Sequence, residues 1–140
     1  MKLKEKGGNK TVLAGVPSSL PSIVKAHRIQ DKVRNVGFDW EEREQVWDKV
    51  KEEFDELMVE VRKEDSDKME AEFGDLFFSL INAARLYNVN PDNALERTNQ
   101  KFIRRFNYLE EHAKEKGVEL KNMSLAEMDA LWNDAKAAGL

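Results

Sequence analysis

Two short acidic stretches carry the residues best suited to chemistry: "EEFDE" at residues 52–56 and "EFGD" at residues 72–75. Side chains three or four positions apart share one face of a helix, so Glu53 pairs with Glu56 and Glu72 with Asp75. Acidic runs in most proteins are simply solvated helix faces. Carboxylate oxygens are also the ligands that hard divalent cations prefer. The spacing alone therefore leaves two interpretations, a solvated surface or a metal site.

The second pair lies in an apolar setting. On a helical wheel of about 100° per residue, Glu72, Asp75, Ser79 and Asn82 form a thin polar strip. The surrounding sequence, "DLFFSLINAARLY", is nearly all apolar. Burying such a strip is costly unless its polar groups find partners. The pattern therefore favours a functional face, with Asn82 as a candidate substrate-binding residue.

The two acidic pairs have matching positions if their helices form an antiparallel hairpin that turns near residue 64. Glu53 then lies level with Asp75, and Glu56 lies level with Glu72. Four carboxylates this close repel one another, and burial raises their pKa values. A bound divalent cation relieves both effects. This register predicts a site for Mg²⁺, with Mn²⁺ as a substitute.

Cationic and aromatic residues follow downstream at helical spacing. Lys101 and Arg105 are four positions apart, as are Trp132 and Lys136. Either pair alone is typical of ordinary surface and core. Beside a metal site, however, Lys and Arg can neutralise phosphate oxygens, and an aromatic ring can stack on a base. The combination predicts a metal-dependent enzyme that acts on a phosphorylated small molecule, with a nucleotide as the expected substrate.

Helical periodicity runs through most of the chain, and no stretch alternates with a period of two. The fold class expected is all-α, with four main helices and a short C-terminal helix. We expect residues 1–18 to form a flexible N-terminal arm and residues 19–140 to form one helical domain. The first helix is expected to begin at Pro21 and to end at Gly37, and a capping box of Asp39 with Glu42 is expected to open a second helix that ends near residue 63. A third helix is expected over about 66–88. The fourth is expected to begin with Asn90 and Pro91 and to end at Gly117, and a capping box of Ser124 with Glu127 is expected to open the last.

The composition excludes several classes of protein. There is no apolar run of about 18 residues and no signal-peptide pattern, so we expect a cytoplasmic protein with no membrane partner. The absence of cysteine excludes disulfides and thiolate zinc sites. With 27 acidic and 23 basic residues, the net charge of −4 argues against a nucleic acid polymer as partner.

Several segments together resemble the catalytic C-terminal half of the longer, two-repeat MazG proteins. Besides the acidic motifs, they are "SLPSIVKAHRIQDKVRNVGFDW", "GDLFFSLINAAR", "ALERTNQKFIRRF" and "MDALWNDAK", and the likeness extends over about residues 12–138. The resemblance implies a MazG-like all-α bundle in which two chains pair to complete each active site. It also implies hydrolysis of a nucleoside triphosphate to the monophosphate and pyrophosphate, with non-canonical nucleotides among the candidate substrates.

The resemblance further implies roles for individual residues. The Mg²⁺ ligands would be Glu53, Glu56, Glu72 and Asp75. Glu52 would be a secondary acid that positions the water, so that Glu52 and Glu53 are the candidate catalytic residues. Contact with the triphosphate and the nucleotide would come from Lys101, Arg105, Trp132 and Lys136.

The apolar "DLFFSLI" segment has large residues on nearly all helix faces, which predicts burial on more than one side. Phe78 lies on the side away from the main apolar stripe. We therefore expect a homodimer or a higher homo-oligomer, with Phe78 as a candidate contact.

Two alternatives compete with this interpretation. A ferritin-like di-metal bundle needs Glu-x-x-His pairs, but His27 and His112 lie in neither acidic stretch, so we set it aside. A non-catalytic nucleotide-binding or helical regulatory domain needs no complete set of carboxylates. The complete pairs favour the enzyme.

Overall fold

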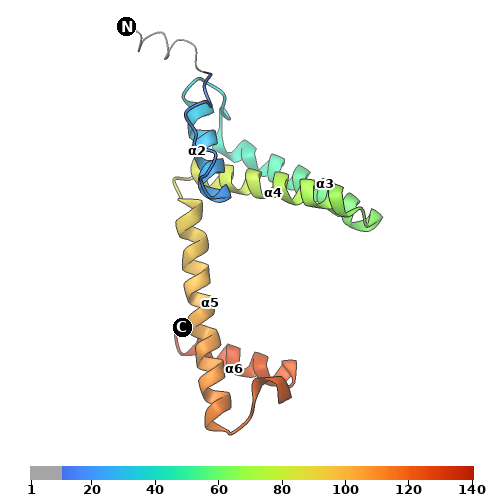
Figure 1. Ribbon diagram of the computed structural model, residues 1–140, viewed down its shortest axis with the longest axis vertical. Coiled ribbons are helices and arrows are strands. Elements are labelled where there is room, and N and C mark those ends of the chain that lie inside the picture. The colour runs from blue at the N-terminus through green and yellow to red at the C-terminus, as the bar shows by residue number, and fades with distance from the viewer. Residues whose placement is uncertain (1–10) are drawn as a thin grey trace. The chain divides into compact units, whose positions relative to one another are not determined.

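The computed structural model describes residues 11–140, and they are entirely helical apart from turns and connections (Figure 1). The predicted all-α fold class is confirmed. Residues 1–10, within the expected N-terminal arm, lie outside the described part. No helix over residues 11–140 has the length and apolar character needed to cross a membrane. The helices are α2 (Ser22–Arg34), α3 (Val46–Lys63), α4 (Ser66–Leu86), α5 (Pro91–Glu115) and α6 (Leu125–Ala137), with 3₁₀ turns at Arg43–Gln45 and Leu120–Asn122.

The chain divides into two compact units. The first ends at Asp92, and the second comprises Asn93–Leu140. The first unit contains α2, α3 and α4, and therefore all of the acidic motifs. Most of α5 and all of α6 belong to the second unit.

The helices α3 and α4 form the hairpin that the sequence predicts, and they lie side by side (Figure 1). The turn falls at Glu64, whose left-handed backbone (φ 55°) ends α3. Asp65 caps α4, because its Oδ1 accepts a hydrogen bond from the backbone N–H of Lys68 at 3.1 Å. Leu57 and Ala83 are buried apolar side chains of the two helices.

Helix α2 and the segment after it are held to α4 by polar contacts. The Nε2 of Gln30 donates to the backbone carbonyl of Phe78 at 3.0 Å. Arg85 forms an ion pair with Asp39, with 2.8 Å between Nη2 and Oδ1. The hydrogen bond from Arg85 is the main cause that lowers the pKa of Asp39. These contacts fix one wall of the cavity described below.

The predicted capping box of Asp39 with Glu42 is wrong. Asp39 caps no helix, because its carboxylate accepts hydrogen bonds from Arg85 and from the backbone N–H of Trp40. The capping box observed here joins Glu42 to Gln45 and opens a 3₁₀ turn. As a result α3 begins at Val46, several residues later than expected.

The second unit packs α6 against the C-terminal part of α5. Its buried apolar residues are Leu109, Ala113, Leu131 and Ala135. The predicted capping box of α6 is confirmed: Ser124 Oγ accepts from the N–H of Glu127, and Glu127 Oε1 accepts from the N–H of Ser124. Gly117, with φ +72°, takes the left-handed conformation just beyond α5, as expected for a helix stop.

Replacement of Leu57 by Ala tests the packing of the hairpin. Leu57 is 3% exposed, so we expect the free energy of unfolding to fall by about 2–5 kcal/mol. Val59 on the same helix is 41% exposed, and Val59→Ala should cost about 0.5 kcal/mol or less. Urea unfolding followed by circular dichroism measures both. Equal losses for the two variants would contradict the packing described here.

Candidate metal centre

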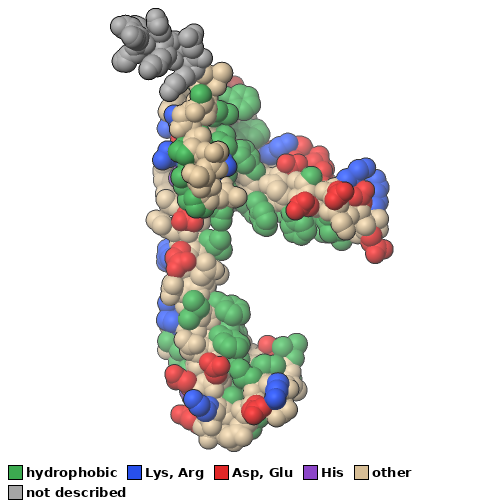
Figure 2. Space-filling model, viewed as in Figure 1, with side chains coloured by type: hydrophobic (Ala, Val, Ile, Leu, Met, Phe, Trp, Pro, Cys, Tyr) green, Lys and Arg blue, Asp and Glu red, His purple; other side chains and the backbone are tan. Residues whose placement is uncertain are grey.

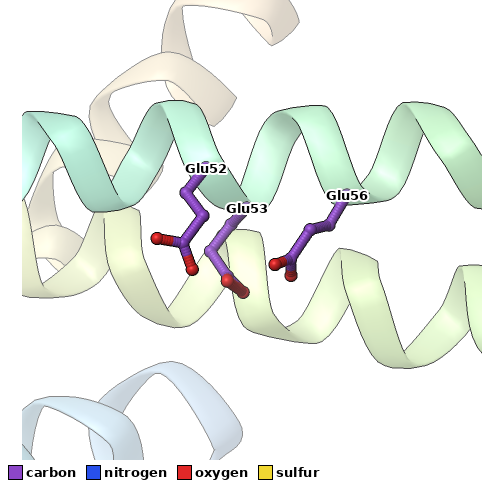
Figure 3. A group of neighbouring side chains, drawn as sticks. All are labelled: Glu52, Glu53 and Glu56. Carbon is purple, nitrogen blue, oxygen red and sulfur yellow. The ribbon is translucent and has the colours of Figure 1, made fainter.

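Three glutamates of α3 extend from the side of the helix that faces α4 (Figure 3). One carboxylate oxygen from each of Glu52, Glu53 and Glu56 lies within 4.8 Å of the others. Glu52 and Glu56 are exposed, whereas Glu53 is buried. The i,i+3 spacing of Glu53 and Glu56 thus brings their carboxylates together, as the helical pattern predicts.

A second group of carboxylates bridges the two helices. Oxygens from Glu53, Glu72 and Asp75 also lie within 4.8 Å of one another. The structure therefore brings together, from two helices, all four residues that the sequence suggests as metal ligands. Glu53 belongs to both groups and is the centre of the cluster.

Burial and mutual repulsion act on Glu53. Glu53 is only 5% exposed to solvent. Burial is the largest cause that raises the pKa of Glu53, and the charges of Glu56 and Asp75 raise it further. Lys49, whose Nζ lies 3.4 Å from Glu53 Oε1, acts in the opposite direction. The net effect is a carboxylate whose charge the fold does not fully compensate.

Glu72 shows the same effect from the other helix. Its pKa is raised first by desolvation and then by the charges of Asp75, Glu53 and Glu60, whereas hydrogen bonding with Glu56 lowers it. Glu72 Oε2 and Glu60 Oε1 are buried with no hydrogen-bond partner among the described residues. Buried acceptors without donors, next to a set of oxygen ligands from acids alone, fit a hard divalent cation such as Mg²⁺ or Mn²⁺.

Sequence reasoning missed Lys49, one turn before the acidic motif. Its Nζ lies 2.9 Å from Glu52 Oε2, and this hydrogen bond is the main cause that raises the pKa of Lys49. The signal was present, since Lys49 stands three and four positions before Glu52 and Glu53. Lys49 supplies a positive charge at the edge of the cluster.

The cluster opens on a cavity of about 660 Å³ within the first unit. Glu53 and Asp75 belong to the cluster and also line the cavity. The predicted polar strip of α4 continues along the wall, because Ser79 and Asn82 line the cavity too. The remaining lining residues come from α2, from the segment before α3, and from both hairpin helices: Ile29, Gln30, Val33, Gly37, Phe38, Asp39, Trp40, Val46, Lys49, Phe78 and Arg85.

The other predicted site residues all belong to the second unit. The Arg105 guanidinium lies 5.7 Å from the centre of the Trp132 ring, so the structure brings these two together. Arg105 Nε also donates to the Leu140 carbonyl at 2.8 Å. Lys101 and Lys136 are exposed, and Lys101 lines a shallow surface hollow with Arg104.

The fold and the centre define a class of helical proteins in which the two helices of a hairpin contribute facing carboxylates to one cluster that could hold a metal ion. Comparison with known proteins narrows this class. Residues 41–109 match the MazG nucleotide pyrophosphohydrolase domain. This chain therefore contains a MazG domain.

Individual relatives agree with this assignment. The nucleoside triphosphate pyrophosphohydrolase/pyrophosphatase MazG of Thermotoga maritima is 38% identical over 137 residues, covering 97% of this chain and 52% of the relative. The nucleoside triphosphate pyrophosphohydrolase of Escherichia coli K12 is 40% identical over 128 residues, 90% of this chain and 49% of the relative. The uncharacterized protein YabN of Bacillus subtilis is 60% identical over 68 residues, 49% of this chain and 14% of the relative. The chain spans about half the length of the first two relatives.

Addition of Mg²⁺ should raise the melting temperature of the protein, because a ligand that binds only the folded state stabilises it. At a concentration 100 times the Kd the gain is about 2.7 kcal/mol. Glu53→Gln should abolish most of this gain, since Glu53 is common to both carboxylate groups. Glu70→Gln removes one exposed charge from α4 and is the matched control. Scanning calorimetry with Mg²⁺ and with a chelator gives the comparison. A full Mg²⁺ effect in Glu53→Gln would contradict the assignment.

The raised pKa of Glu72 predicts a pH effect in metal-free protein. Above its ordinary value of 4.5, the folded state holds the Glu72 proton more tightly than the unfolded state does. Stability therefore falls as pH rises through the window between 4.5 and the raised folded value. Glu72→Gln removes this penalty. Its stability relative to wild type should increase as pH rises above 4.5, measured by urea unfolding with chelator present. Glu70→Gln again controls for loss of one charge, and a pH-independent difference for Glu72→Gln would contradict the prediction.

Proposed function

We propose that this domain hydrolyses nucleoside triphosphates to the nucleoside monophosphate and pyrophosphate, with Mg²⁺ as cofactor and Mn²⁺ as a substitute. The observation that carries the proposal is the carboxylate cluster around the buried Glu53, which shares Glu53 and Asp75 with the cavity beside it. The names of the relatives in Thermotoga maritima and Escherichia coli K12 support the reaction type.

In the proposed reaction, a water oxygen attacks the α-phosphorus, the anhydride bond between the α- and β-phosphates breaks, and pyrophosphate leaves with the bonding electron pair. Glu53, Glu56, Glu72 and Asp75 would hold the cation, which when bound would polarise the phosphate and lower the pKa of a water. Glu52 positions the attacking water from the exposed edge of the cluster. Lys49 adds positive charge that offsets the developing negative charge.

We assign the contacts to the triphosphate to Lys101, Arg105 and Lys136, whose charges balance the phosphate oxygens that the cation does not reach. Trp132 supplies an aromatic face for the nucleotide. Asn82, in the wall of the cavity, contacts the substrate from α4. This assignment rests on the family resemblance and on the charge that a triphosphate needs.

We further propose that the domain works as a homodimer or a higher homo-oligomer. Hydrophobic side chains gather along the α3–α4 hairpin (Figure 2), and several large ones are exposed. Exposed apolar patches of this kind often mark sites of protein–protein interaction. The exposed aromatic residues of the hairpin are Trp47, Phe54, Phe73, Phe77 and Phe78.

A panel of canonical and damaged nucleoside triphosphates tests the reaction directly, with pyrophosphate and monophosphate quantified by chromatography in the presence of Mg²⁺. We expect equal amounts of the two products from at least one triphosphate. Glu53→Gln should lower kcat by about 100-fold or more, because it removes a ligand of the cation. Glu52→Gln should lower kcat by a smaller factor of about 10 to 100.

Glu70→Gln is again the control and should keep the wild-type rate. Release of inorganic phosphate instead of pyrophosphate would show that a different anhydride bond is cleaved. If no triphosphate yields pyrophosphate, the non-catalytic nucleotide-binding domain becomes the better interpretation. A folded Glu53→Gln protein with a normal rate would overturn the role of the cluster.

A further inference from the structure

Gln30 is a polar residue in the middle of the apolar stripe of α2, and it is only 2% exposed. Its Nε2 donates to the backbone carbonyl of Phe78 at 3.0 Å. Its Oε1 is buried and has no hydrogen-bond partner among the described residues. One half of the side chain thus holds α2 to α4, while the other half is an acceptor without a donor.

The chemistry of its neighbour fixes which atom of the amide remains unpaired. The Phe78 carbonyl can only accept a hydrogen bond, so the Gln30 NH₂ group must face it. Rotating the amide would set oxygen against oxygen and leave two polar groups unsatisfied. Buried acceptors are destabilising when they are left unpaired. Gln30 Oε1 therefore has no donor among the described residues to satisfy it.

Gln30 lines the cavity that adjoins the carboxylate cluster. The cavity volume of about 660 Å³ lies within the range of small-molecule sites. Three aromatic side chains, Phe38, Trp40 and Phe78, also line it and offer faces on which a planar base can stack. Since Glu53 and Asp75 lie in the same wall, a nucleotide held at the metal by its phosphates has this cavity within reach of its base.

The neighbouring polar groups complete the pattern. Ser79 Oγ donates its proton to the Leu76 carbonyl at 2.8 Å, so towards a ligand it can only accept. Asn82 Oδ1 accepts from Arg85 Nη2 at 2.6 Å, which leaves the Asn82 NH₂ group as the donor of that side chain. The wall therefore presents acceptors and a donor together. Nucleobases present the complementary mixture of N–H donors and acceptors along one edge.

We infer that Gln30 is a base-binding residue, whose Oε1 accepts a hydrogen bond from an N–H group on the hydrogen-bonding edge of the nucleobase. The inference rests on the proposed nucleotide substrate and adds a determinant of base selection to it. Gln30 thereby couples recognition to the fold, because the same amide joins α2 to α4.

The test pairs a protein change with a matching substrate change. Gln30→Met keeps the length of the side chain and removes the acceptor. The matching change is a preferred triphosphate in which the donor N–H is blocked by methylation, such as N6,N6-dimethyl-ATP beside ATP. For the wild-type protein, kcat/KM should be about 10- to 100-fold lower with the blocked analogue than with ATP. For Gln30→Met, the ratio of the two kcat/KM values should approach one. Ile29→Val, a small apolar change in the same wall, controls for altered cavity shape and should keep the wild-type ratio.

Two further measurements separate base recognition from a structural role and from the proposed reaction. Binding of inorganic tripolyphosphate, which has no base, should be the same for wild type and Gln30→Met; an equal loss for tripolyphosphate and nucleotide would overturn the inference. The inference would also be overturned if Gln30→Met discriminated against the blocked analogue as strongly as the wild-type protein does. If no triphosphate is hydrolysed, the proposed reaction fails. Gln30 is then still tested by the Kd values of the same two nucleotides for wild type and Gln30→Met, measured with Mg²⁺ by intrinsic tryptophan fluorescence. Absence of any nucleotide binding would overturn both.

Discussion

Repulsion among the carboxylates of α3 and α4 is a constraint that the first unit has to accommodate. Glu53 lies at a buried position between α3 and α4, where an apolar side chain would stabilise the hairpin more. Its neighbours in the cluster are further acids, and Lys49 compensates only part of their charge. A fold that keeps such a group buried gives up stability, and binding of a cation at the cluster would offset that cost.

The surrounding elements make sense as supports for this centre. The ion pair of Asp39 with Arg85 and the hydrogen bond from Gln30 to Phe78 hold α2 and the following segment beside α4. Together they enclose a cavity that begins at two of the metal-ligand candidates. The carboxylate cluster and the cavity thus share Glu53 and Asp75, so a cation held there would lie beside any molecule bound in the cavity.

Much of this arrangement could be predicted from local sequence signals. Helical periodicity and a short turn near residue 64 predicted the hairpin, and its register brought the carboxylates of α3 and α4 together. The Ser124 capping box was predictable because capping depends on residues only three positions apart. The predicted Asp39 capping box is wrong because the sequence signal considers only neighbouring residues, whereas Asp39 bonds to Arg85, 46 positions away.

The cavity could not be predicted, since its walls come from separate parts of the chain. Gln30 illustrates the difficulty. A polar residue within an apolar stripe was the only signal in the sequence, and its partner, the carbonyl of Phe78, is visible only in the folded chain. Lys49, by contrast, stood at helical spacing from Glu52 and Glu53 and could have been recognised.

The carboxylates of α3 and α4 are proposed to form one cation site between them. Anomalous diffraction from crystals grown with Mn²⁺ would locate the ion. We expect a strong anomalous peak about 2.0–2.3 Å from oxygens of Glu53, Glu56, Glu72 and Asp75, and its loss in Asp75→Asn crystals. A peak that contacts α3 alone, or no peak at the cluster at saturating Mn²⁺, would contradict it.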